Sequence, residues 1–404
     1  MKHLIVVTHP HRLGSASMPR FAEMICREMT ARGYEVELFR SKDVLSGLKG
    51  VGGALRKYAG YVDDYLLAPP KLKKRIATLK KEGKRPLIVV GDHALGMIAR
   101  HIADEPHVVH CHDFLAQRSA CGDFPENVTK GSGKIYQSLI RSGFRRLRNF
   151  ISISEATQQD LHRFLAKEPE LSAVVYNGLN FDYHPIGADE ARKTLKPHFI
   201  SEEIPPFFFH VGGNQWYKNR FGVIEIYRSY LEQMRAGILA SQTQEAPALV
   251  MVGPEPKQAL REAAGDVPEL GGRVIFLSNL TNEQLRAAYN LAKVFVFPSL
   301  EEGFGWPPLE ALACGTPVLM TEKAPMTEVG GDAVDYIPRM PSSADAQAKQ
   351  RWAETAATQL DLITLKNSEP ERQNRLAQAG RFNADKIIDR YESIYREVFE
   401  RETQ

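Results

Sequence analysis

Cysteine is scarce in this chain of 404 residues: there are four, and no two of them form a Cys-x-x-Cys pair. A zinc site of the usual cysteine spacing is therefore not expected, and a chain of this length can bury a large core without disulfides. Long apolar runs are also missing. The apolar run near the N-terminus, Leu4–Val7, is too short for a signal peptide, and no stretch approaches the roughly 18 residues of a membrane span. These absences predict a protein of a reducing compartment, the cytoplasm.

Two familiar motifs are absent as well. No Gly-x-Gly-x-x-Gly follows the first predicted strand, which argues against a dinucleotide-dependent dehydrogenase. No known nucleic-acid-binding motif occurs, so nucleic acid is not an expected partner.

The charge is spread unevenly along the chain. The net charge is +3, but residues 1–178 carry 28 lysines and arginines against 18 acids, and residues 179–404 carry 24 against 31. The cations of the first half concentrate in residues 40–85 and 133–150, where Leu139, Ile140, Phe144 and Leu147 add an apolar side. Two interpretations stay open: peripheral contact with an anionic membrane at its inner face, or an ordinary solvated surface.

Short β-type runs alternate with amphipathic helical stretches throughout the chain, which is the pattern of parallel α/β sheets. The predicted strands lie at 4–8, 35–39, 87–91, 108–111, 149–153 and 173–176, and then at 207–211, 248–253, 274–277, 294–298 and 317–320. Residues 342–375 are polar and are expected to form solvent-facing helices. A long amphipathic helix is expected from 383 to the C-terminus. The sequence thus predicts an α/β protein of two Rossmann-like domains, joined near residue 180.

The most informative stretch is PSLEEGFGWPPLEALACGTPV, residues 298–318. A strand ends here, a glycine-rich turn follows, and a helix is predicted to open near Leu309. Backbone N–H groups of such a turn and helix start suit an anionic ligand. Glu302 and Glu310 lie on either side of the turn, and carboxylates accept hydrogen bonds from the hydroxyls of a sugar or ribose.

This stretch resembles the family 4 glycosyltransferases, enzymes of the GT-B fold, whose signature is two glutamates around a GFG-type turn. Here it reads Glu302-GFGWPPL-Glu310. Other stretches carry the same resemblance: HVGGNQWYKNR, RVIFLSNLTNEQLRAAYNLAKVFVFPS, APMTEVGGDAVDYIP, VVHCHDF, FISISEATQQDL and VVYNGLN. The resemblance implies an acceptor-side domain at 1–178, a donor-side domain at 179–382, parallel sheets facing across a cleft, and a terminal helix 383–404 that packs back on the first domain.

The resemblance also implies roles for particular residues. At the reacting centre, Glu302 contacts the hydroxyls of the donor sugar, Lys218 neutralises the pyrophosphate, and His112 lies beside the donor sugar. Glu310 holds the nucleotide ribose. The implied donor-binding set is Gly14, Ser15, Gly213, Asn214, Lys218, Asn279, Leu280, Phe304, Gly305, Leu309 and Glu310. His110 is expected to be structural.

One departure concerns the pyrophosphate. The family usually has an arginine five residues before the lysine, and this chain has Gly213 there. Asn214, Gln215 and Arg220 are the alternatives left open as substitutes.

The resemblance implies retaining transfer from a nucleoside-diphosphate sugar, with UDP preferred over GDP, to a polysaccharide, glycolipid or other glycoconjugate. No two aspartates are separated by one residue, so the D-x-D pair of metal-dependent glycosyltransferases is missing and no metal or other cofactor is expected. The expected partners are a nucleotide-sugar donor and a sugar- or lipid-linked acceptor. The alternative is a catalytically silent, donor-binding subunit that supports a partner enzyme.

Overall fold

The computed structural model describes residues 2–10, 17–48, 53–199, 203–243, 245–342 and 345–403. Two compact units make up the chain. Unit 1 contains residues 1–124, 128–176 and 385–404, and unit 2 contains residues 125–127 and 177–384. The predicted loop residues Gly14 and Ser15 lie outside the described residues.

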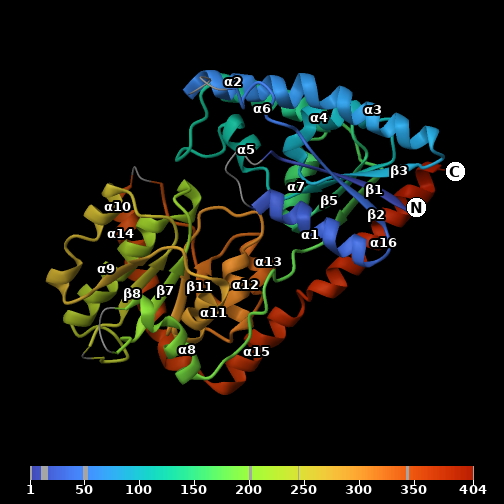
Figure 1. The fold of residues 1–404 in the computed structure, drawn as a ribbon. Coiled ribbons are helices and arrows are strands. Elements are labelled where there is room, and N and C mark those ends of the chain that lie inside the picture. The colour runs from blue at the N-terminus through green and yellow to red at the C-terminus, as the bar shows by residue number, and fades with distance from the viewer. Residues whose placement is uncertain are drawn as a thin grey trace. The chain divides into compact units, whose positions relative to one another are not determined.

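Unit 1 is built on a parallel sheet with helices packed against it (Figure 1). The sheet has six strands in the order β2-β1-β3-β4-β5-β6. Its strands are β1 (His3–Thr8), β2 (Glu35–Arg40), β3 (Pro86–Val90), β4 (His107–Cys111), β5 (Asn149–Ser152) and β6 (Leu171–Val174). Its helices are α1 (Ser17–Ala31), α2 (Gly53–Val62), α3 (Ala68–Lys81), α4 (Gly96–Ala99), α5 (Leu115–Cys121), α6 (Gly131–Phe144), α7 (Glu155–Phe164) and α16 (Ala384–Thr403), with single turns at Asp63–Leu67, His93–Leu95 and Arg100–Ile102.

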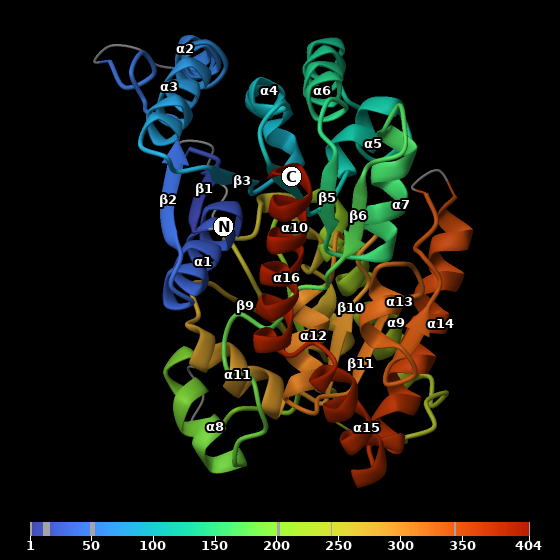
Figure 2. The same cartoon turned by 90° about the vertical axis from the view of Figure 1, so that its right-hand side faces the viewer.

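Alternation along the strands assigns the two faces of this sheet. Leu4 and Val6 of β1 pack with α1 and with α16, whereas Ile5 and Val7 pack with α3, α4 and α6. The terminal helix α16 lies against the sheet of unit 1 through Ile388, Tyr391, Ile394, Tyr395 and Val398 (Figure 2). These apolar residues recur at helical spacing, so one stripe of α16 is buried and the rest of the helix faces away.

Unit 2 has its own six-stranded parallel sheet, of order β12-β11-β10-β7-β8-β9. Its strands are β7 (Phe207–Val211), β8 (Ala248–Val252), β9 (Val274–Leu277), β10 (Val294–Phe297), β11 (Val318–Thr321) and β12 (Asp335–Ile337). Its helices are α8 (Ala188–Leu195), α9 (Arg220–Arg235), α10 (Gln258–Ala263), α11 (Asn282–Leu291), α12 (Trp306–Ala313), α13 (Met326–Gly330), α14 (Ala346–Lys366) and α15 (Glu369–Gly380), with single turns at Lys196–His198, Trp216–Lys218 and Val267–Leu270. The α/β class and the pair of parallel sheets are as predicted.

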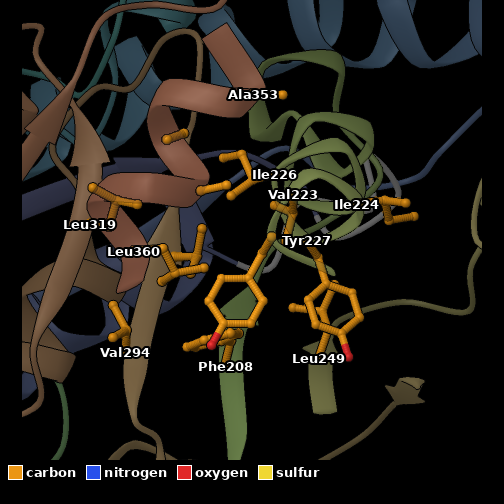
Figure 3. Close-up of a cluster of buried hydrophobic side chains, with 14 of the residues drawn as sticks. Phe208, Val223, Ile224, Ile226, Tyr227, Leu249, Val294, Leu319, Ala353 and Leu360 are labelled. Carbon is orange, nitrogen blue, oxygen red and sulfur yellow. The ribbon is translucent and has the colours of Figure 1, made fainter. Parts of the chain in front are cut away.

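One expectation for unit 2 is met only on one side of a helix. Helix α14 faces solvent along one side, but Ala353, Ala356, Ala357 and Leu360 are buried and pack with α9 and with the sheet (Figure 3). Alanine side chains let the two helices approach closely, which a reading of overall polarity does not reveal.

Two predicted boundaries also shift. Helix α12 begins at Trp306 rather than at Leu309, because Pro307 and Pro308 fit the first turn of a helix, where no intrahelical N–H is needed. Strand β6 ends at Val174 because its partner β5 ends at Ser152, so the ladder stops there.

The basic segments of unit 1 form α2, α3 and α6. Stacked rings of Tyr61 and Tyr136 connect α2 with α6. In the parts of the chain that the structure describes, no helix combines the length and apolar character needed to cross a bilayer.

Candidate functional site

The strand order of unit 2 places two loops together. Strands β7 and β10 are neighbours, although the chain leaves β7 toward β8 on one side and continues from β10 to β11 on the other. Ligands of open α/β sheets bind at the carboxyl ends of strands at such a switch point. The loop 212–219 leaves the carboxyl end of β7, and the stretch 298–305 leaves that of β10.

An ion pair joins these two loops. Nζ of Lys218 donates hydrogen bonds to both carboxylate oxygens of Glu302, at 2.7 and 3.0 Å. The Lys218 side chain is 16% exposed and the Glu302 side chain 8%. A pair this shielded from water interacts far more strongly than a surface salt bridge, and each partner fixes the position of the other.

Asn219 holds the lysine loop in place, and sequence reasoning missed this residue. Its side chain donates to the carbonyl of Pro298 at 2.9 Å and accepts from the amide of Gly222, which makes it the N-cap of α9. Asn219 takes a left-handed backbone conformation with φ 49°, which asparagine tolerates better than most residues. Its cap position before an amphipathic helix is the signal that could have identified it.

The glycine-rich turn connects the ion pair to α12. Gly305 is the N-cap of this helix with φ 114°, a conformation that favours glycine. The ring of Phe304 is buried against Trp306 and Phe382, so the side chain anchors the turn while its backbone borders the site. Because the next two helical residues are prolines, N–H donors at this helix start come from the turn and from Trp306 alone.

Glu310 lies inside α12 and is buried. Its Oε2 accepts a hydrogen bond from the Tyr289 hydroxyl at 2.8 Å, and Tyr289 is wholly buried on α11. Burial raises the pKa of the Glu310 carboxyl to about 7, although the Tyr289 hydrogen bond and the charge of Lys218 act in the opposite direction. The carboxylate therefore changes charge near neutral pH.

Gly213 occupies the position where the family usually has an arginine, and the polar residues Asn214 and Arg220 follow it in the chain. Asn214 is bound at both ends, since its amide donates to the Glu255 carbonyl at 3.1 Å and its oxygen accepts from Arg220 at 2.6 Å. Arg220 is buried, and its second hydrogen bond goes to the carbonyl of Pro254. Its Nε has no hydrogen-bond partner among the residues that the structure describes.

Three further residues that were predicted to bind the donor lie in different environments. Asn279 is exposed after β9 with φ 58°, and Leu280 beside it is half-buried. Leu309 is fully buried and its amide donates to the Gly305 carbonyl, so this residue shapes the helix core.

His112 belongs to unit 1 and follows β4. Its Nε2 donates to the Gly91 carbonyl at 2.9 Å, and its Nδ1 has no partner among the described residues. Burial lowers the pKa of His112, so the neutral ring presents an acceptor at Nδ1. His110 is structural as expected, because its Nε2 lies 2.7 Å from the hydroxyl of Tyr395 on α16.

Within unit 2 the structure therefore brings together Lys218, Glu302, the turn at Phe304 and Gly305, and the start of the helix that carries Glu310. Among the described residues, no group of three His, Cys, Asp or Glu side chains has a geometry that could hold a metal ion. The arrangement offers one cation, backbone N–H groups and two carboxylates, which together suit a ligand with phosphates and hydroxyls.

Comparisons with known proteins identify the family of this chain. The family model "Glycosyl transferases group 1" matches residues 192–381, and the model "Glycosyltransferase Family 4" matches residues 18–183. The O-antigen chain mannosyltransferase RfbU of Salmonella typhimurium is 23% identical over 285 residues, 70% of this chain and 67% of that protein. The serotype-specific mannosyltransferase WbdA of Escherichia coli is 39% identical over 97 residues, which are 23% of this chain and only 12% of that protein.

Among solved structures, Anabaena Alr3699/HepE in complex with UDP has the same fold, with a TM-score of 0.65, 16% identity, and coverage of 98% of this chain and 100% of that one. Together, the two matched family models account for most of both units. The chain belongs to glycosyltransferase family 4 and is a glycosyltransferase of the GT-B type.

Proposed function

We propose that this enzyme transfers a sugar from a nucleoside-diphosphate sugar, UDP in preference to GDP, to a polysaccharide, glycolipid or other glycoconjugate. The observation that carries the proposal is the shielded pair of Lys218 and Glu302 beside the turn that leads into Glu310. When the donor binds, its diphosphate would accept hydrogen bonds from Lys218 and from the amides of the turn. The sugar hydroxyls would then donate to Glu302 and the ribose hydroxyls to Glu310.

Support for the donor and acceptor classes comes from the relatives. The Anabaena protein binds UDP, and the Salmonella protein is an O-antigen chain mannosyltransferase. The preference for UDP is supported by this solved neighbour, which was determined in complex with UDP. Buried Arg220, with its unpartnered Nε, is our candidate for the second cation near the pyrophosphate in place of the family arginine.

The proposed chemistry is retaining and independent of metal. The acceptor hydroxyl passes its proton to an oxygen of the departing diphosphate, and its oxygen bonds to the anomeric carbon on the face from which the diphosphate departs. The electron pair of the broken bond stays with the diphosphate. Lys218 and the turn amides stabilise the charge that develops on the leaving group. Catalysis then consists chiefly of positioning and of this electrostatic stabilisation.

Binding measurements test this proposal. Calorimetric titration of the purified protein with UDP, GDP and ADP in the presence of EDTA should give binding of UDP, with weaker binding of the other two. Absence of binding by all three nucleotides without metal would contradict the metal-free donor site. Binding of UDP without cleavage of any UDP-sugar would favour the alternative, a catalytically silent donor-binding subunit.

We also propose that the enzyme contacts an anionic membrane from its cytoplasmic side. Helices α2 and α6 of unit 1 expose Leu55, Tyr58, Ile135 and Leu139 among their cations. The acids that follow α2, Asp63 and Asp64, point inward: Asp63 binds the amides of Leu45 and Ser46, and Asp64 binds the hydroxyl of Ser41. Exposed apolar side chains with cations and without facing acids fit the surface of an anionic bilayer.

Vesicle sedimentation checks this surface. The wild-type protein should sediment with vesicles of phosphatidylcholine and phosphatidylglycerol, and added salt should weaken the binding because surface electrostatics are screened. Ile135→Ser with Leu139→Ser should reduce the bound fraction severalfold, whereas Leu365→Ser, an exposed apolar side chain on α14, should not. Equal binding of wild type and the double variant would contradict the assignment.

A further inference from the structure

The carboxylate of Glu310 is hydrogen-bonded through one of its two oxygens. Oε2 accepts from the hydroxyl of Tyr289 at 2.8 Å, and Tyr289 reaches it from the neighbouring helix α11. No described residue donates a hydrogen bond to Oε1, although Glu310 as a whole is only 8% exposed. A shielded carboxylate oxygen without a donor costs folding free energy. In the described part of unit 2, Oε1 is thus an acceptor available to a ligand.

Rings from three other elements fix the position of the Tyr289 hydroxyl. The ring centroids of Phe209 on β7 and Phe295 on β10 lie 5.1 and 5.2 Å from that of Tyr289, both edge-to-face. The ring of Tyr183, in the segment before α8, lies at 5.9 Å. All four rings are buried. Close packing and edge-to-face contacts leave the Tyr289 ring little room to carry its hydroxyl away from Glu310.

A second connection fixes α11 against the helix that carries Glu310. Thr316 follows the end of α12, and its hydroxyl donates to the Tyr289 carbonyl at 2.7 Å. The amide of Thr316 donates in turn to the Ala311 carbonyl of α12 at 2.9 Å. The side chain and the backbone of Tyr289 are therefore both anchored, so the fold sets the direction from which its hydroxyl meets Glu310.

Tyr289 and Lys218 are the groups that favour the ionised form of Glu310. Burial raises the pKa of the carboxyl to about 7, and the Tyr289 hydrogen bond and the charge of Lys218 act against this effect. The other titratable groups close to Glu310 are Tyr183 and Cys314, whose pKa values are raised chiefly by burial, so both stay neutral. A hydrogen bond donated to a carboxylate favours its charged form. Loss of the Tyr289 hydroxyl should therefore leave a carboxyl that ionises only at higher pH.

We propose that Tyr289 is a positioning residue of the donor site, which turns the Glu310 carboxylate so that Oε1 accepts from the ribose hydroxyls. The inference deepens the proposed function and rests on it, because the ribose is that of the nucleoside-diphosphate donor. Tyr289 is wholly buried and acts through Glu310 alone. Through this pair the enzyme selects a ribonucleotide donor, because a nucleotide without ribose hydroxyls would leave Oε1 shielded and without a donor.

Binding of UDP and of 2′,3′-dideoxy-UDP, which lacks both ribose hydroxyls, measures this selection. At pH 8 the wild type should bind UDP at least about tenfold more tightly, the size of effect expected for hydrogen bonds to a charged group. Tyr289→Phe keeps the ring and removes only the hydroxyl, and it should reduce the preference for UDP severalfold. Calorimetry with each nucleotide gives the two affinities.

A second buried tyrosine of unit 2 supplies the matched control. The hydroxyl of Tyr227 on α9 donates to the Pro247 carbonyl at 2.7 Å. Tyr227→Phe therefore also removes a buried, hydrogen-bonded hydroxyl, but one that does not contact Glu310. It should leave the preference for UDP over 2′,3′-dideoxy-UDP unchanged.

The pH dependence separates positioning from a general loss of structure. Both nucleotides carry the same diphosphate, so its titration cancels in the ratio of the two affinities. For the wild type this ratio should rise with pH as Glu310 ionises around its pKa of about 7. The rise should move to higher pH in Tyr289→Phe and stay in place in Tyr227→Phe. A ratio and a pH dependence in Tyr289→Phe equal to those of the wild type would overturn the inference, while UDP binding still upheld the donor site.

A titration without nucleotide makes the test independent of the donor. Carbon-13 spectra of protein labelled at the glutamate carboxyls, assigned with Glu310→Gln, should show the wild-type Glu310 carboxyl titrating with a pKa of about 7. Tyr289→Phe should move this midpoint to higher pH, and Tyr227→Phe should not. An unchanged midpoint in Tyr289→Phe would contradict the inference even if the wild type bound no nucleotide, an outcome that would separately contradict the proposed function.

Discussion

Replacing Lys218 by alanine should weaken UDP binding by about 100-fold, the largest single-residue effect expected at the donor site. A hydrogen bond between a charged side chain and a phosphate contributes about 1.5–3 kcal/mol. The substitution also leaves the carboxylate of Glu302 shielded and without its partner, and this charge would then repel the diphosphate. Calorimetry with UDP measures the change in affinity, and UDP release from the cleaved donor measures the accompanying loss of rate.

A lysine on the same unit supplies the control for this variant. Lys293→Ala removes an equal charge from an exposed position just before β10, at the opposite end of the strand from Glu302, and should leave UDP binding unchanged. In the double variant Lys218→Ala with Glu302→Gln, part of the lost affinity should return, because the repelling carboxylate is gone. Equal affinities of Lys218→Ala and wild type would mean that the diphosphate is held elsewhere.

Replacing Glu310 by glutamine should raise the free energy of unfolding at pH 8 by about 3 kcal/mol. It should also remove the contribution of this carboxyl to the pH dependence of that free energy. The carboxyl has a pKa of about 7 in the folded protein, against an ordinary value of 4.5. The folded state therefore holds its proton more tightly, and the free energy of unfolding falls as the pH rises from about 4.5 to about 7, then stays constant. Glutamine cannot ionise but can still accept the hydrogen bond from Tyr289.

Urea unfolding of wild type and Glu310→Gln between pH 4 and pH 8 measures this difference. The two proteins should be about equally stable at pH 4 and diverge toward pH 8, whereas Glu232→Gln, an exposed glutamate on α9, should follow wild type throughout. The variant should nevertheless bind UDP less well, because an ionised carboxylate is the better acceptor for ribose hydroxyls. A constant stability difference between pH 4 and pH 8 would show that Glu310 does not titrate in this range.

This opposition between stability and binding has a physical basis. A buried carboxylate costs folding free energy, and the wild type keeps one on α12 beside the glycine-rich turn. Residues that bind ligands are often held in environments that folding alone would not select. The variant with the better fold and the poorer donor affinity would be direct evidence that Glu310 serves ligand binding.

The local pattern of the sequence was enough to predict much of this enzyme. Short apolar runs located the strands except β12, and the Glu302-GFGWPPL-Glu310 stretch indicated the family. These predictions succeeded because the extent of a strand and the conformation of a glycine turn are set by neighbouring residues. The prediction for α14 considered only the polar composition of its sequence and therefore missed that its alanines are buried.

Contacts between distant residues were decided by the tertiary structure. Three hydrogen bonds join elements that lie far apart in the chain. They run from Tyr289 to Glu310, from Asn219 to the Pro298 carbonyl, and between His9 and Asp92. None of these pairs has a fixed spacing in the sequence, because each depends on which strands become neighbours in a sheet. The sequence by itself determined the α/β class, the strands and the glutamate signature. Only the order of the strands, set by how the two faces of each sheet bury their helices, determined which side chains meet at the carboxyl ends of the strands.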